Sequence, residues 1–294
     1  MGIHKGLLSF LCGLCVLCGE TAAAPPHVVF VTGDNEYGSE ISMPMIAAIL
    51  EKHHGMKTTV LYSEDETGQR NRDGNSIPGL EALRTADLAV FFLRYRQLPD
   101  EQLQEIVDFA ASGRPMIGLR TSTHAFNYEG PPHDKWNNGF GRDYFGQQWI
   151  AHHGHNNSSV IQVVPAMADE PILRGVDREF WVHSWLYNMS QGELRLPENC
   201  RILLEGDATK GIERGGEKFG THEPVAWTRE MPVDGGRSRR VFYTSLGHPR
   251  DFAIESPRRL MVNAIFWGLG REKEIPAGGT DVTIVGEYNP PDPH

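Results

Sequence analysis

Histidine is concentrated in one short stretch of the chain. Three of the 13 histidines, His152, His153 and His155, fall within four residues. Imidazoles ligate divalent metals and transfer protons near neutral pH. His153 and His155 are therefore candidate ligands of a divalent metal, which is the one cofactor that the sequence suggests. The alternative is hydrogen bonding to loops or substrate hydroxyls, because the adjacent His152 and His153 cannot both point inward along an extended strand.

A second group of polar residues directly follows the apolar stretch 115–119. Arg120, Thr121, Ser122 and His124 place a guanidinium, two hydroxyls and an imidazole at the turn where related hydrolases carry their nucleophile. The flanking glycines of a Gly-x-Ser-x-Gly motif are missing, so Ser122 and Thr121 can equally serve to hydrogen-bond the turn. His124 is the stronger candidate for acid–base chemistry.

The turn after the apolar stretch 27–32 carries two carboxylates and a phenol, from Asp34, Glu36 and Tyr37. In doubly wound α/β folds, ligands bind where the strands reach the carboxyl edge of the sheet. These side chains are therefore candidate substrate ligands. Asp34 is also a routine turn residue, so a structural role is an equal alternative.

A further imidazole, His248, follows the β-branched stretch 240–244, and the carboxylate of Glu223 lies on a predicted loop. A carboxylate beside an imidazole fixes its tautomer and raises its basicity. The sequence thus suggests a His248–Glu223 pair.

Most of the tryptophans surround these histidines in the sequence. An aromatic wall suits a sugar ring, whose C–H face stacks on indole while its hydroxyls bind polar side chains, and Trp136 is one candidate for such a contact. Core packing is the alternative explanation. The tryptophans concerned are at positions 136, 149, 181, 185 and 227.

The elements that position these residues alternate between short β-branched runs and longer amphipathic segments, which is typical of βα units around a mostly parallel sheet. We predict strands at 27–32, 57–62, 87–93, 115–119, 160–164, 201–204, 224–228 and 240–244. Helices are predicted around 45–50 and 103–110, and a last helix is expected to begin with Ser256 as its N-cap. The expected fold class is α/β.

Five motifs, taken in order, resemble those of one family. They read VFVTGDNEY at 29–37, GLRTSTHAF at 118–126, NGFGRD at 138–143, HGH at 153–155 and SLGH at 245–248. Over about residues 27–270 the chain resembles the ThuA-like (trehalose-utilisation) family, in the secreted planctomycete type.

The resemblance implies a three-layer, mostly parallel, flavodoxin-like sheet similar to that of class I glutamine amidotransferases. The 120–124 turn would take the place of their nucleophile elbow, but it contains no cysteine, so glutamine hydrolysis is not expected. The resemblance also implies a role in the metabolism of sugars or keto-sugars, with His124, His155 and His248 lining the pocket.

The two ends of the chain are expected to lie outside this domain. Residues 1–23 read as a cleaved signal peptide, with an apolar run too short to span a bilayer and small residues before Pro25. The protein is then expected in the periplasm or secreted, without a membrane span after cleavage. A lipoprotein is less favoured because a bulky leucine precedes each early cysteine. Residues 271–294 are expected to form a loosely packed C-terminal extension.

The formal net charge is −10, which disfavours a nucleic-acid partner, since phosphate binding relies on clustered Lys and Arg. The short basic run 237–240 is expected to be a solvated turn. The expected partner is a small carbohydrate, and a homo-oligomer is left open.

The leading hypothesis is a sugar-active hydrolase, lyase or isomerase. Its catalytic candidates are His124, His248, His155 and Arg120. Its candidate substrate contacts are Asp34, Glu36, Tyr37, Thr121, Trp136, His153 and Glu223. The alternatives are a non-catalytic carbohydrate-binding module, for which the same groups would suffice, and a metal-dependent hydrolase using His153 and His155.

Overall fold

The computed structural model describes residues 1–2, 24–189, 191, 195–233 and 237–290. The predicted signal peptide therefore lies almost wholly outside the described residues.

One mixed sheet runs through the domain, in the strand order β2-β1-β3-β4-β9-β8-β7-β5-β6. Its strands are β1 (His27–Gly33), β2 (Lys57–Leu61), β3 (Leu88–Leu93), β4 (Met116–Leu119), β5 (Asn157–Val163), β6 (Glu179–Val182), β7 (Cys200–Lys210), β8 (Lys218–Val233) and β9 (Arg237–Thr244). Strands β2, β1, β3, β4 and β9 pair in parallel, and β9, β8, β7, β5 and β6 pair antiparallel. The predicted α/β class is confirmed, and its flavodoxin-like parallel half continues into an antiparallel half.

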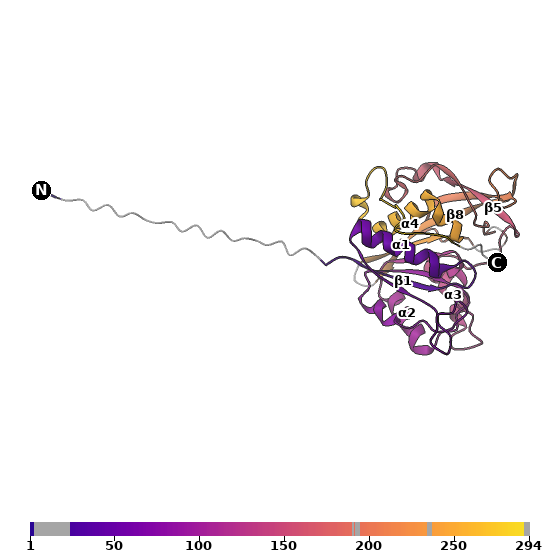
Figure 1. Cartoon of the computed structure of the whole chain (residues 1–294), viewed down its shortest axis with the longest axis horizontal. Coiled ribbons are helices and arrows are strands. Elements are labelled where there is room, and N and C mark those ends of the chain that lie inside the picture. The colour runs from indigo at the N-terminus through magenta and orange to yellow at the C-terminus, as the bar shows by residue number, and fades with distance from the viewer. Residues whose placement is uncertain (3–23, 190, 192–194, 234–236, 291–294) are drawn as a thin grey trace.

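Helices cover both faces of this sheet (Figure 1). They are α1 (Ser39–His54), α2 (Asp100–Ala111), α3 (Lys135–Phe140) and α4 (Glu255–Gly268). Side chains alternate along β1, so that Val28 and Phe30 join the core under α1 and α4, while Val29 and Val31 join the core with α2 and α3. Since parallel strands are covered on both faces, β1 and β3 are buried at every position. The result is the expected three-layer arrangement.

Two local predictions were wrong. Helix α4 begins at Glu255 without a side-chain cap, because the Ser256 hydroxyl donates instead to Asp177 Oδ2 (2.7 Å). The basic run 237–240 is the start of β9 rather than a solvated turn. Arg239 within it is buried, and its guanidinium donates to the carbonyl of Ala110.

The C-terminal extension is packed against the domain rather than loosely attached. Val282 is buried, and its carbonyl accepts a hydrogen bond from Arg258 Nε at 3.0 Å. The imidazoles of His53 and His54, at the end of α1, donate to carbonyls of residues 283 and 281 at 2.9 and 2.8 Å. The extension therefore contributes to the layer formed by α1 and α4.

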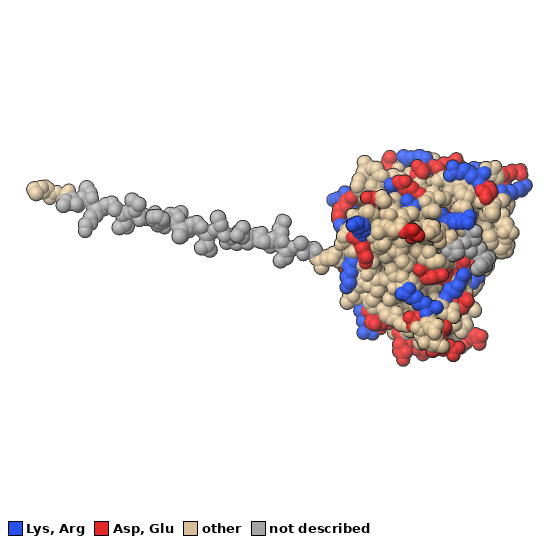
Figure 2. Space-filling model, viewed as in Figure 1, with Lys and Arg blue, Asp and Glu red and all other residues tan. Residues whose placement is uncertain are grey.

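Positive and negative side chains are interspersed over the face of the molecule shown in Figure 2. None of the helices in the described ranges combines the length and apolar character needed to cross a bilayer.

Candidate functional site

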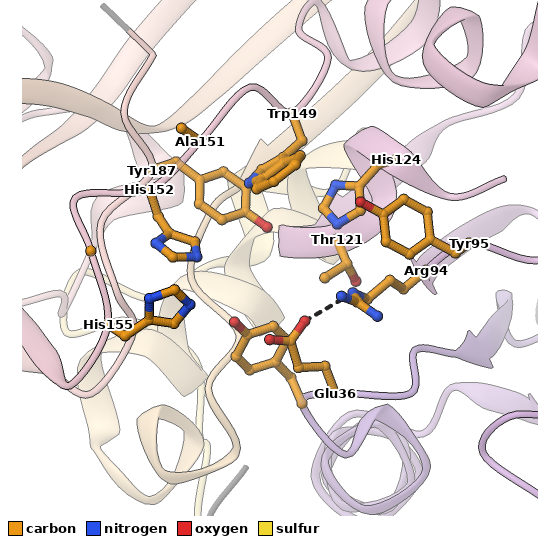
Figure 3. A pocket seen from close by; sticks show the side chains of 12 residues that line it. Glu36, Arg94, Tyr95, Thr121, His124, Trp149, Ala151, His152, His155 and Tyr187 are labelled. Atoms are coloured by element: carbon orange, nitrogen blue, oxygen red, sulfur yellow. Dashed lines mark ion pairs between the residues drawn. The ribbon is translucent and has the colours of Figure 1, made fainter. Parts of the chain in front are cut away.

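A pocket of about 440 Å³ lies at the carboxyl edge of the parallel half of the sheet (Figure 3). The loops that follow β1, β3 and β4 build one side of it, as expected for a doubly wound sheet. The segment 149–155 and Tyr187, from the loop after β6, build the other side. The lining residues are Glu36, Tyr37, Arg94, Tyr95, Thr121, His124, Trp149, Ala151, His152, Gly154, His155 and Tyr187.

His124 lies at the end of a 3₁₀ turn (Arg120–His124) that directly follows β4. Its ring is held between Tyr95 and Trp149, with centroids 5.0 Å from each. Burial, reinforced by the charges of Arg94 and Arg120, holds the pKa of His124 well below its usual 6.5. The buried Nδ1 has no hydrogen-bond partner. His124 is thus a neutral imidazole at the pocket wall at physiological pH.

An ion pair joins Arg94 Nε and Glu36 Oε2, at 2.8 Å, on one side of the pocket (Figure 3). A second guanidinium nitrogen, Arg94 Nη1, donates to Asn35 Oδ1 at 2.9 Å. The pair offers hydrogen-bond donors and acceptors side by side with little net charge. Such a surface suits the hydroxyls of an uncharged polyol.

Arg120 does not line the pocket, although the sequence made it a catalytic candidate. Its side chain is fully buried behind the pocket wall, and its backbone φ is +39°, a strained value for a residue other than glycine. The guanidinium donates to the carbonyls of Ser245 (2.7 Å) and Trp185 (3.2 Å) and to the hydroxyl of Tyr37 (3.1 Å). Arg120 therefore connects the loops that follow β1, β6 and β9 behind the pocket wall.

Asp34 is also buried behind the wall rather than exposed to a substrate. Its carboxylate accepts hydrogen bonds from the Tyr37 backbone N–H (2.5 Å) and the Thr121 hydroxyl (3.3 Å). Burial raises the pKa of Asp34 to about 6. Because Tyr37 and Thr121 both line the pocket, Asp34 positions them.

The histidine cluster divides between two directions. His152 and His155 line the pocket, with ring centroids 4.6 Å apart. His153 instead points to Glu223, with Nε2 3.1 Å from Oε1. The carboxylate that the sequence assigned to His248 therefore pairs with His153, and neither His153 nor Glu223 lines the pocket.

The structure does not support the predicted metal site. In the ranges that the structure describes, no three His, Cys, Asp or Glu side chains come close enough together to hold a metal ion. His153 is hydrogen-bonded to Glu223, while His155 packs against His152 and Trp185.

His248 lines a second hollow, which it shares with His183, Trp185 and Arg250. Its Nδ1 accepts a hydrogen bond from the backbone N–H of Arg250 (3.1 Å), and its ring stacks on His183 at 5.2 Å. Burial, together with nearby cationic groups, lowers the pKa of His248 to about 3. The expectation that His248 lines the same pocket as His124 and His155 is therefore wrong.

The tryptophans serve different purposes. Trp149 lines the pocket, whereas Trp227 belongs to the core and donates its indole N–H to the Phe145 carbonyl at 2.8 Å. Trp136 lies on α3 with Lys135 over its ring and does not line the pocket. For Trp136 the core-packing alternative holds.

Sequence reasoning missed Arg94, Tyr95 and Tyr187 as lining residues. The first two directly follow a predicted strand, so the rule that picked out Asp34 and His124 could have found them. Tyr187 lies in an irregular segment after β6, and no sequence signal marked it.

The family model described as trehalose utilisation, ThuA, matches residues 27–268. The chain belongs to the ThuA family. This membership relates the chain to carbohydrate utilisation at the level of the family.

Two solved structures support the same fold. A putative ThuA-like protein from Bacteroides uniformis superposes with a TM-score of 0.56 at 14% identity, covering 86% of this chain and 95% of the other. One from Parabacteroides merdae gives 0.53 at 17% identity, covering 88% and 96%. No match was found among curated proteins.

Proposed function

We propose that this ThuA-family chain is an enzyme that acts on a sugar or keto-sugar derivative, as a hydrolase, lyase or isomerase. The observation that carries the proposal is His124. It is a buried, neutral imidazole with an unpartnered ring nitrogen, at the wall of a pocket rich in hydroxyls and aromatic rings. A residue needed only for packing would not require an ionisable ring in this position.

The pocket offers the contacts that a sugar requires. The indole of Trp149 and the ring of Tyr95 provide apolar surfaces for the C–H face of a pyranose. The Glu36–Arg94 pair and the Thr121 hydroxyl provide acceptors and donors for its hydroxyl groups. The volume of about 440 Å³ lies within the usual range for small-molecule sites.

A neutral His124 can accept a proton without first having to lose one. It can take that proton from a substrate hydroxyl or from a carbon next to a carbonyl, and return it in a later step. A carbonyl-bearing sugar fits this chemistry well, because an imidazole near a carbonyl can move protons between adjacent carbons. We further propose that residues 1–23 direct export of the protein to the periplasm or the medium and are then cleaved off. A sugar substrate would be met there.

The test is a turnover screen of the purified mature chain by NMR, against disaccharides and their 3-keto derivatives. The wild-type protein is compared with His124→Asn and with His222→Asn. His222 is an exposed histidine that pairs with Glu205 and Asp207 away from the pocket, so it provides a matched control. We expect turnover by the wild type and the His222 variant, and its loss in the His124 variant.

The other outcomes separate the alternatives. Saturable binding without turnover in any of the three proteins would contradict the proposal and favour a binding module. Turnover that survives in His124→Asn would show an enzyme that works through other residues. Turnover that is abolished by a chelator and restored by a divalent metal would favour the metal-dependent hydrolase.

A further inference from the structure

Arg120 carries a positive charge that the described residues do not neutralise by an ion pair. Its side chain is fully buried, and its three hydrogen bonds go to two carbonyls and the Tyr37 hydroxyl. Asp251 also acts on this charge from a distance, but its carboxylate already accepts hydrogen bonds from Ser184 and from backbone N–H groups. Burying a charge without a direct counter-ion is costly, which points to a use for it.

Two phenols separate this charge from the pocket. The guanidinium carbon of Arg120 lies 4.1 Å from the ring centroid of Tyr37 and 5.0 Å from that of Tyr187. Both tyrosines are almost fully buried, and both line the pocket. The guanidinium of Arg120 is thus covered by the rings of Tyr37 and Tyr187, which themselves line the pocket.

The hydroxyls of both phenols are available as donors. Arg120 Nη2 donates to the Tyr37 oxygen, so the proton of that phenol is free to be given to another acceptor. The Tyr187 hydroxyl is directed into the space between His124, His152 and Glu36 (Figure 3). Burial raises the pKa of both phenols, so they stay protonated at physiological pH.

Two fixed O–H donors with a buried cation behind them favour a negatively charged oxygen over a neutral one. Donors fixed in this way are the usual means by which enzymes stabilise charge that develops on oxygen during a reaction. Glu36, the carboxylate that lines the same pocket, is already paired with Arg94 and so opposes such a charge only weakly.

We propose that Tyr37 and Tyr187, with Arg120 as a positioning residue behind them, bind the oxyanion of an enolate formed from a carbonyl-bearing substrate. This deepens the proposed function and rests on it. His124 takes the proton from the carbon next to the carbonyl. The C–H electron pair becomes a C=C bond, and the carbonyl π pair moves to the oxygen that the two phenols hold. The hydroxyl on the deprotonated carbon then passes its proton to this oxygen, and His124 returns its own proton to the former carbonyl carbon. The product is the isomer in which the carbonyl and the hydroxyl have exchanged carbons.

The first experiment measures anion preference directly. Binding of 4-nitrophenolate is compared with that of its uncharged methyl ether, in the full mature chain at a pH where the phenol is ionised. We expect wild type to bind the anion about tenfold more tightly, and Tyr187→Phe and Tyr37→Phe each to lose most of that preference. Both variants keep a ring against Arg120, but Tyr37→Phe also removes the hydroxyl that accepts a hydrogen bond from Arg120, so Tyr187→Phe is the variant more certain to fold.

Tyr144→Phe is the matched control, because Tyr144 also has an arginine over its ring, Arg239 at 5.3 Å, but lies outside the pocket. We expect it to keep the wild-type preference. Equal binding of the anion and the ether by the wild type would overturn the proposal, as would an unchanged preference in folded Tyr187→Phe.

The second experiment follows exchange of substrate C–H for deuterium in D₂O by NMR, with 3-keto-disaccharides as substrates. We expect exchange in the wild type and a fall of about a hundredfold in Tyr187→Phe. Exchange lost in His124→Asn but unchanged in both tyrosine variants would leave the proposed function standing and overturn the oxyanion pair. If no sugar reacts but the anion preference is present and depends on Tyr187, the oxyanion pair stands and the proposed sugar chemistry falls.

Discussion

At the scale of single residues, the site is distinguished by ionisable groups that are buried just behind its surface. His124 lines the pocket, and Asp34 and Arg120 hydrogen-bond to residues that line it, yet each of the three is at least nine-tenths buried. Buried charges lower stability unless they are fully satisfied, so proteins seldom keep them where apolar residues would serve. Here each group has a definite task, since Asp34 and Arg120 fix pocket side chains and His124 faces the pocket itself.

The state of His124 can be read from its ring protons. Burial keeps its pKa well below 6.5, so its NMR shifts are expected to stay constant from about pH 8 down to about pH 6. For His222, partial burial opposes protonation, but the hydrogen bonds that its ring donates to the carboxylates of Asp207 and Glu205 raise the pKa above 6.5. The two histidines should therefore titrate in clearly separate ranges. A midpoint for His124 at or above that of His222 would show that burial does not suppress protonation of His124.

Asp34 makes stability depend on pH. Its pKa is raised from 3.8 to about 6, so the folded state favours the protonated form. The contribution of this carboxyl to stability is fully present below about pH 4 and is lost as the pH rises through about 6. Asp34→Asn removes that dependence. The free energy of unfolding of Asp34→Asn minus that of wild type should therefore be about 3 kcal/mol more favourable to the variant at pH 8 than at pH 4. Urea denaturation of both proteins at the two pH values measures this change.

Any effect of the Asp34→Asn substitution that does not depend on pH is the same at pH 4 and pH 8, so it cancels when the two differences are compared. An equal difference at pH 4 and pH 8 would show that Asp34 titrates normally.

At the scale of elements, the sequence predicted the parallel half well because its signals are local. The buried run 87–93 and the turn 120–124 show their roles within a few residues, through apolar character and through position after a strand. The pairing of His153 with Glu223 could not be found in this way. It depends on the long β7–β8 hairpin, which brings Glu223 opposite Gly206 and so within reach of a loop 70 residues away.

The loops at the second hollow are joined by one carboxylate. Asp251 accepts hydrogen bonds from the backbone N–H groups of His183 and Ser184, from the Ser184 hydroxyl and from the Gly247 N–H. Asp251→Ala leaves these buried donors without an acceptor, so we expect a loss of about 3 kcal/mol or more in free energy of unfolding. Chemical denaturation measures it, with Asp169→Ala, at an exposed position, as the control. Similar stability of the two variants would show that the loops do not depend on Asp251.

At the scale of the whole molecule, the sheet joins a parallel half that builds the pocket to an antiparallel half that supports its far wall. The C-terminal extension closes the layer of α1 and α4. Its composition, rich in glycine and proline, suggested a loose segment because it lacks periodic apolar residues. The contacts that hold it are single side chains and backbone carbonyls, which leave no periodic pattern to read.

A pair of valines in the extension tests this packing. Val282 is 2% exposed and Val285 is 36% exposed. Val282→Ser should lower the free energy of unfolding by about 2 kcal/mol, because it removes buried apolar surface and buries a hydroxyl. Val285→Ser should change it by less than about 0.5 kcal/mol. Thermal and urea unfolding of both variants measure the difference, and equal values would show that the extension does not contribute to stability.

Strand β1 separates the start of the folded domain from the pocket. His27 lies at the amino end of the strand, and the loop that carries Glu36 and Tyr37 follows its carboxyl end. Seven extended residues span roughly 20 Å. A bead, a fused carrier protein or a lipid joined through the residues before His27 would thus sit behind the domain, with the mouth of the pocket facing the surrounding solution. Immobilisation through that end should leave ligand access unimpeded, whereas attachment through lysines scattered over the surface would not guarantee it.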